Sequence, residues 1–207
     1  MILMVFIMLA LLSYRPPQSN KMLFNPQLKL WLGLSLFLLA NATFAQFTIH
    51  YGHTRLVGQI YSLNADLNYG LSEVAIEAPH HGVPLVFVFT VIVERERRIV
   101  WNETIITLTQ RYKLQYNLLH RQYLVQYINT DNKETFLTLT AALTSLGKLI
   151  DFPLLNKHLL RNGTYWVNFR IHLDIESLPV PLRPIAYLSS EWRLKSDWYL
   201  CPLPLVK

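Results

Sequence analysis

Histidine is the residue type in this chain that most directly suggests metal chemistry. His80 and His81 are adjacent and precede Gly82, while His50 and His53 lie in or beside an extended segment. Zinc sites need at least three protein ligands, and neighbouring residues of an extended chain point to opposite sides. The spacing of His50 and His53 does not suit a shared metal either. We therefore expect solvated loop histidines and no metal site.

Asp174 and Glu176 are the carboxylates whose spacing fits acid–base catalysis. In an extended strand they would share one face about 7 Å apart, which is compatible with the paired carboxylates of glycoside hydrolysis. Alternating strands produce such pairs freely, and Arg170 and His172 continue the same face as a charge ladder. No glycine-flanked serine nucleophile, phosphate-cradling loop or zinc-protease helix occurs in the sequence. We expect no catalytic residue, no cofactor and no enzyme.

Two groups of residues are candidates for an interaction surface. Arg95, Arg97 and Arg98 alternate with glutamates at the end of a hydrophobic strand, where they either protect a strand edge or dock an acidic partner. Trp192 and Trp198 fall on one face of the predicted last strand. They either pack in the core or mark an exposed contact with a protein or a membrane.

Alternation of apolar and polar residues dominates the chain after residue 45 and predicts strands with one wet face. The run Leu85–Val93 is instead apolar throughout, which indicates a central strand covered on both sides. Segments 107–116 and 121–128 predict a hairpin with a turn at 117–120, and 129–132 predicts the next turn. The expected strands are 47–51, 61–69, 85–93, 106–116, 123–128, 165–175 and 192–200.

Helical patterns are few and short. Leu139, Leu143, Leu146 and Ile150 form one apolar stripe, which Thr138 or Thr140 could cap. Shorter helices are expected over 73–78, capped by Ser72 and ended by Pro79, and from Pro181 to Tyr187. About seven strands with short helices between them predict a mainly β fold, an antiparallel two-sheet sandwich of immunoglobulin-like architecture. A small barrel is the alternative.

The sandwich must be held by packing, because the chain contains one cysteine. Cys201 therefore has no partner for an internal disulfide, including the one that is typical of immunoglobulin domains. We expect it to act as a small buried apolar residue.

The first 45 residues have the composition of an export signal. Lys29 precedes the apolar run Leu30–Ala40, and small residues up to Ala45 offer a cleavage site. Met22 begins a complete signal at 22–45, so residues 1–21 are either an over-extended start or an additional leader. Cleavage after Ala45 would leave 46–207 as a single β-rich domain. With the signal removed, we expect a periplasmic protein. If Leu30–Ala40 is retained, we expect the domain to be anchored to the inner membrane.

Charge argues against a nucleic-acid partner. The whole chain has a formal net charge of +6, and residues 1–45 contain Arg15, Lys21 and Lys29 but no acid. The remaining domain is therefore nearly balanced, with no dense basic stripe of the kind that nucleic-acid binding requires.

The chain resembles a family of short exported proteobacterial proteins that carry a domain of unknown function, some of which are labelled proline-rich signal peptide proteins. The similarity rests on the signal and on seven segments that span nearly all of 46–207. These segments are Tyr61–Tyr69, Gly82–Leu85, Gln110–Tyr112 with Gln122–Val125, Leu173–Pro179, and Pro181–Pro184 with the tail Trp192–Tyr199. The resemblance implies an accessory role beside an envelope sensor and supplies no catalytic residues.

Three functions follow in order of expectation. The first is a non-enzymatic envelope domain that binds a protein, such as the extracytoplasmic part of a sensor. The second is a binder or carrier of an apolar envelope ligand in an aromatic-lined cavity. The third is a hydrolase that uses histidines or carboxylates.

Overall fold

The computed structural model describes residues 46–97, 99 and 101–205, which form one compact unit with its own core. The predictions on residues 1–45, and the position of Arg98, lie outside these residues. Nine strands occur in the described part, all paired antiparallel. They are β1 Phe47–Val57, β2 Ile60–Tyr69, β3 Leu85–Arg95, β4 Glu103–Asn117, β5 Gln122–Tyr127, β6 Asn132–Phe136, β7 Lys148–Asn156, β8 Tyr165–Leu173 and β9 Tyr199–Leu203.

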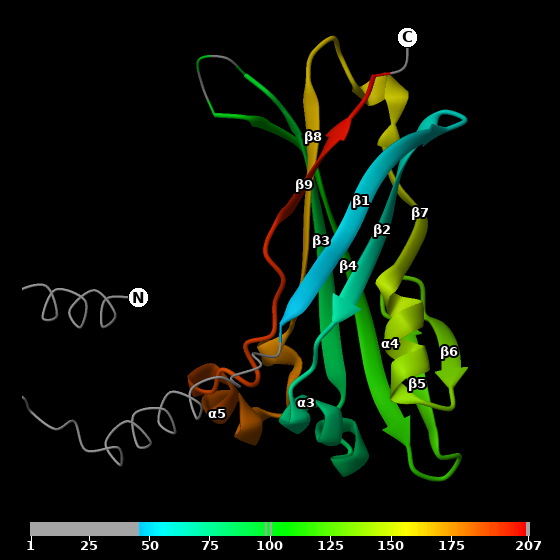
Figure 1. Ribbon diagram of the computed structural model, residues 1–207, viewed down its shortest axis with the longest axis vertical. Helices are drawn as coiled ribbons and strands as arrows, with labels where there is room; N and C mark the ends of the chain where they lie inside the picture. The colour runs from blue at the N-terminus through cyan, green and yellow to red at the C-terminus, as the bar shows by residue number, and fades with distance from the viewer. Residues whose placement is uncertain (1–45, 98, 100, 206–207) are drawn as a thin grey trace, which may run out of the picture. The chain divides into compact units, whose positions relative to one another are not determined.

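The strands form two sheets, as the alternating pattern predicted. One has the order β1-β2-β7 and the other the order β6-β5-β4-β3-β8-β9, and neither closes into a barrel. Figure 1 shows the smaller sheet lying across the larger one. The fold is therefore mainly β and consistent with the predicted sandwich.

The core lies between the sheets and is built from the inner faces of their strands. On β3, the side chains of Leu85, Phe87, Phe89, Val91 and Val93 are fully or almost fully buried. β3 is central in its sheet, flanked by β4 and β8. The prediction of a central strand over Leu85–Val93 is therefore confirmed.

Close packing of β1 on the larger sheet joins the two layers. A Cβ atom at Gly52 would lie 2.4 Å from the ring of Phe169 on β8 and 3.3 Å from that of Tyr199 on β9. The hydroxyl of Thr54 donates a 2.8 Å hydrogen bond to the carbonyl of Pro202. Figure 1 shows β1 running beside β9, in agreement with these contacts.

Short helices fill the connections, with the predicted caps. Ser72 and Thr138 each accept a hydrogen bond from the backbone N–H three residues later. Pro184 lies in the first turn of its helix, where a missing N–H costs nothing. The α-helices are α3 Glu73–Glu77, α4 Leu139–Gly147 and α5 Arg183–Leu188, and the 3₁₀ helices are η1 Ala78–His81, η2 Lys157–Leu159, η3 Ile175–Ser177 and η4 Val180–Leu182.

The prediction that one helical stripe extends to Ile150 is wrong. α4 ends at Gly147, where a Cβ would lie 2.2 Å from the carbonyl oxygen of Leu67 on β2. The next residues form β7, which pairs with β2, and Ile150 is 75% exposed. Hydrogen bonding to a neighbouring strand therefore overrides the helical spacing. β6 is also absent from the prediction, because it is almost wholly exposed and carries no apolar alternation.

The last strand is shorter than predicted. β9 begins at Tyr199, and the segment before it touches β8 through Leu194 and Ser196, whose backbone atoms bond to those of Leu173 and Ile171. Trp192 is 6% exposed and belongs to the core, whereas Trp198 is half-exposed. The two tryptophans therefore do not share one strand face. Trp192 follows the expectation of core packing, and Trp198 does not.

Cys201 is buried on β9, as expected, and its burial raises the pKa of the thiol to about 11. Within the described residues, no helix is both long and apolar enough to cross a membrane.

Candidate functional site

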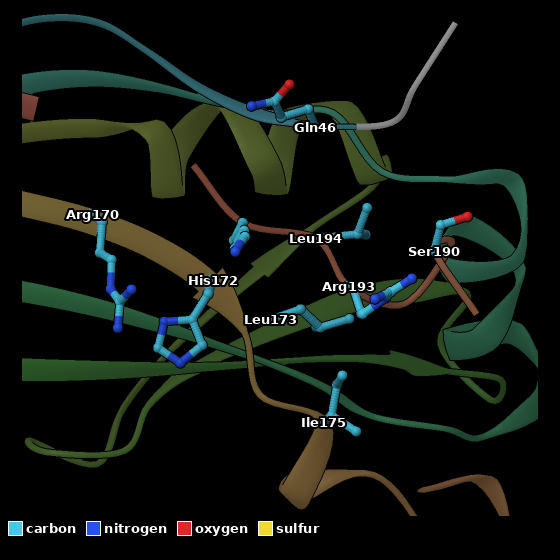
Figure 2. A pocket seen from close by; sticks show the side chains of 9 residues that line it. Gln46, Arg170, His172, Leu173, Ile175, Ser190, Arg193 and Leu194 are labelled. Atoms are coloured by element: carbon cyan, nitrogen blue, oxygen red, sulfur yellow. The ribbon is translucent and has the colours of Figure 1, made fainter. Parts of the chain in front are cut away.

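A pocket of about 570 Å³ opens beside the end of β8 and is the best candidate for a binding site. Strand alternation turns Arg170 and His172 to the outer face of the larger sheet, away from the core residues Phe169 and Ile171. Figure 2 shows both side chains extending from the same side of β8. The segment that precedes β9 forms the opposite wall. It is held by hydrogen bonds from the N–H of Leu173 to the carbonyl of Leu194 and from the N–H of Ser196 to the carbonyl of Ile171.

The lining is basic and partly apolar. Among the described residues that line the pocket, none is acidic. They are Gln46, Arg170, His172, Leu173, Ile175, Ser190, Arg193, Leu194 and Lys195. Backbone pairing of His172 with Lys195 brings the basic residues of two distant segments to one place.

Arg170 is positioned by an aromatic ring. Its guanidinium carbon lies 4.4 Å from the centroid of Trp198, in cation–π geometry. The Nε atom of Arg170 is shielded from solvent and has no hydrogen-bond partner among the described residues. Trp198, one of the predicted surface residues, therefore contributes by supporting a basic residue of the pocket.

His172 is held in its neutral form more strongly than an exposed histidine. Burial lowers its pKa, the positive charges of Arg170 and Arg111 lower it further, and Asp174 acts in the opposite direction. The Nδ1 atom is buried and has no hydrogen-bond partner in the described structure.

Asp174 and Glu176 do not form the predicted carboxylate pair on one strand, because β8 ends at Leu173. Asp174 caps η3 by accepting from the N–H of Glu176, and its carboxylate also accepts from Arg111 and from Ser177. Glu176 instead accepts from the hydroxyl of Tyr187 and faces Arg183. Each carboxylate has its own partners, and the shared strand face from which a spacing of about 7 Å was predicted is not formed.

A second feature adjoins the pocket, an apolar surface on η4 and α5. Val180, Ile185 and Leu188 are 69%, 61% and 85% exposed, and Pro181 and Pro184 are exposed as well. The opposite side of α5 carries the buried Ala186. We call these five exposed residues the apolar face. Its end leads through Ser189 to Ser190 of the pocket.

The predicted arginine cluster lies at the end of β3. Arg95 and Arg97 both form ion pairs with Glu103, at 2.9 and 2.6 Å, and the hydrogen bond from Arg97 is the main cause that lowers the pKa of this carboxyl. The two described arginines therefore share one carboxylate, and the structure does not bring them together with Trp192 or Trp198.

The adjacent histidines also have separate environments. His80 stacks on Tyr116, with ring centroids 4.5 Å apart, and is hydrogen-bonded to the hydroxyl of Tyr123. Within the described residues, no three His, Cys, Asp or Glu side chains gather closely enough to hold a metal ion.

Comparison with known proteins places this domain in a family. The family model of DUF4390, a domain of unknown function, matches residues 45–202. The chain belongs to the DUF4390 family. No curated protein and no solved structure matches it. The predicted resemblance to a family with a domain of unknown function is confirmed to this extent.

A smaller pocket of the DUF4390 domain, about 410 Å³, lies where β7 faces β4 and α4. Tyr112, Tyr127 and Phe152 line it together with polar residues such as Gln110 and Lys148. Burial is the main cause that raises the pKa of both tyrosines, so their hydroxyls stay protonated. This pocket is the described cavity closest to the aromatic-lined site that was predicted for an apolar ligand.

Sequence reasoning found Arg170 and His172 on one polar face but missed Arg193 and Lys195. The two missed residues flank the buried Leu194, so their alternation was a usable signal for a shared outward side. Their partner β8 lies about twenty residues earlier in the chain, and no local pattern indicates that pairing. The outward direction of the apolar face was also missed, because an apolar stripe on a helix normally faces the core.

Proposed function

We propose that this DUF4390 protein is a non-enzymatic domain of the cell envelope that binds a partner protein through the apolar face of η4 and α5. The main observation in support of this proposal is that five apolar side chains of η4 and α5 lie on the surface, and no described element covers them. Clusters of exposed apolar residues mark contact surfaces more often than single exposed residues do. The proposed partner is an envelope protein, such as the extracytoplasmic part of a sensor.

The proposal that the domain is not an enzyme is supported by the contacts of its candidate catalytic residues. The carboxylates with a possible catalytic spacing are engaged in capping and ion pairs, and His80 is stacked on Tyr116 and hydrogen-bonded to the hydroxyl of Tyr123. No nucleic acid is proposed, because the charges of 46–207 nearly balance.

The envelope location is proposed from the export signal at residues 22–45. Cleavage after Ala45 would leave Gln46, which precedes β1, as the first residue of a periplasmic domain. Retention of Leu30–Ala40 would instead hold the domain at the inner membrane.

Site-specific crosslinking in cells tests the proposed contact. A photoreactive residue at position 185 or 188 should capture a recurrent protein of defined mass, because both side chains point away from the core. The same residue at position 99 or 159 is the matched control, since Ile99 and Leu159 are exposed apolar residues outside η4 and α5. If positions 185 and 188 yield no recurrent product, or the same products as the controls, the proposal is wrong.

A carrier of an apolar envelope ligand is the second candidate, and the pocket lined by Tyr112, Tyr127 and Phe152 favours it. Native mass spectrometry of protein purified from the envelope should then show a bound lipid. Tyr127→Ala should abolish that adduct. Protein that is consistently free of ligand would contradict the carrier function.

A further inference from the structure

We infer that the basic pocket beside β8 binds a phosphate group carried by a larger molecule. This binding site is separate from the apolar face, so it goes beyond the proposed protein contact. The inference rests on the charges, the unpaired nitrogen atoms and the lining of the pocket.

The positive charges of the pocket have no carboxylate to balance them. Arg170, Arg193 and Lys195 form no ion pair with any carboxylate of the described residues. Asp174, the acidic residue next to the pocket, is engaged by Arg111 and Ser177. Cations that are gathered at a partly buried site repel one another, and a bound anion converts that repulsion into attraction.

Two side-chain nitrogen atoms of residues that line the pocket are also left without partners. The Nε of Arg170 and the Nδ1 of His172 are both shielded from solvent and unpaired within the described structure. Most buried polar atoms in proteins have a hydrogen-bond partner, because leaving one unpaired is unfavourable. A bound group that accepts hydrogen bonds would pair with the Nε–H of Arg170, and with Nδ1 of His172 where that nitrogen carries a proton.

Phosphate fits this arrangement better than a carboxylate does. Basic side chains line the pocket from two chain segments, Arg170 and His172 on β8 and Arg193 and Lys195 on the segment before β9. Figure 2 shows the labelled ones on these two segments. A carboxylate is satisfied by one guanidinium in a two-pronged contact, whereas the oxygens of a phosphate accept from donors in several directions. Arginine is the residue that most often fills this role, and the ring of Trp198 holds Arg170 in place.

The size and the apolar part of the lining indicate what carries the phosphate. A pocket of about 570 Å³ is much larger than an inorganic phosphate ion. Leu173, Ile175 and Leu194 form the apolar part of its lining. A phosphate ester with an apolar portion, such as a lipid headgroup with part of its glycerol backbone, would use both kinds of surface.

A titration at constant ionic strength tests the inference. Protein purified from the envelope of expressing cells, with its N-terminus defined by intact mass, is titrated with inorganic phosphate, glycerol 3-phosphate and a short-chain phosphatidic acid. Trp198 reports binding by fluorescence, and the His172 resonance reports it by NMR. We expect a saturable response and an upward shift of the His172 pKa, because the anion opposes the effects of Arg170 and Arg111 and adds to that of Asp174.

Matched variants locate the site. The double substitution Arg170→Gln and Arg193→Gln should weaken binding at least tenfold. Lys133→Gln with Lys157→Gln removes the same charge at residues that do not line the pocket, and should leave binding unchanged. Circular dichroism checks that both variants keep the strand content of the parent.

Comparison of the three ligands distinguishes a phosphate group on a lipid from a free phosphate ion. A phosphatidic acid or glycerol 3-phosphate that binds more tightly than inorganic phosphate supports a phosphate carried by a larger molecule. Equal affinities for all three would overturn that part of the inference and leave a free phosphate ion as the ligand. No saturable response to any phosphate, an equal response to acetate, or equal weakening in the control variant would overturn the inference. Crosslinking through Ile185 and Leu188 does not depend on any of these outcomes, so the two proposals fail separately.

Discussion

The inner and outer faces of β8 differ in nearly every property, although they alternate along the same nine residues. Phe169 and Ile171 point inward and are fully buried, while Arg170 and His172 point outward into the basic pocket. The side chains of the inner face pack against other side chains of the core. The outer face keeps charges and donor atoms that the described residues leave unpaired. Residues that form the core and residues that line the pocket thus alternate along the strand.

Truncating neighbouring residues on the two faces tests whether the inner and the outer face contribute differently to the free energy of unfolding. Phe169→Ala removes a ring that packs against Phe89 and Tyr199, and should cost about 3–5 kcal/mol of unfolding free energy. Arg170→Ala loses only its contact with Trp198 and should cost less than about 1 kcal/mol. Urea unfolding followed by circular dichroism measures both. Equal losses would show that the outer face is structural.

A second prediction concerns the contact that joins β1 to the inner face. Gly52→Ala places a methyl group 2.4 Å from the Phe169 ring and should cost about 1–3 kcal/mol, because the ring must move. In a Phe169→Leu background the same change should cost less, since the smaller side chain leaves room. A double-mutant cycle measures this coupling. Strictly additive losses would mean that the Phe169 ring does not cause the cost.

The inner face could be predicted from the sequence because its information is local. Alternation along 61–69 and 165–173 indicated which side chains are buried, and the unbroken apolar run indicated the central strand. Prediction failed where a long-range contact decides the structure. Ile150 continues a helical stripe, yet β2 draws the chain after Gly147 into β7.

The candidate site was only half predictable for the same reason. Arg170 and His172 were placed together by strand alternation. Arg193 and Lys195 join them only through the pairing of Leu194 and Ser196 with β8. Asp174 was placed on the strand, but a carboxylate that can bond to the N–H two residues later favours a cap. The missing information in both cases was where β8 ends and what lies beside it.

The smallest predicted effect is a pH dependence of stability that comes from His172 on the outer face. Burial and the charge of Arg170 hold the pKa of His172 below its ordinary 6.5, so the unfolded chain takes up this proton first as the pH falls. Stability should therefore rise with pH through the interval just below 6.5, because the unfolded state binds more protons there. His172→Gln should flatten this part of the pH profile, measured by urea unfolding, whereas His120→Gln in the exposed 118–121 turn should not. Bound phosphate should flatten it as well, since it raises the pKa of His172 toward its value in the unfolded chain. If His172→Gln and the parent lose stability in parallel on acidification, protonation of His172 does not contribute to the pH dependence of folding. The outer face would then differ from the inner face in the type of its side chains, with no effect on stability through this titration.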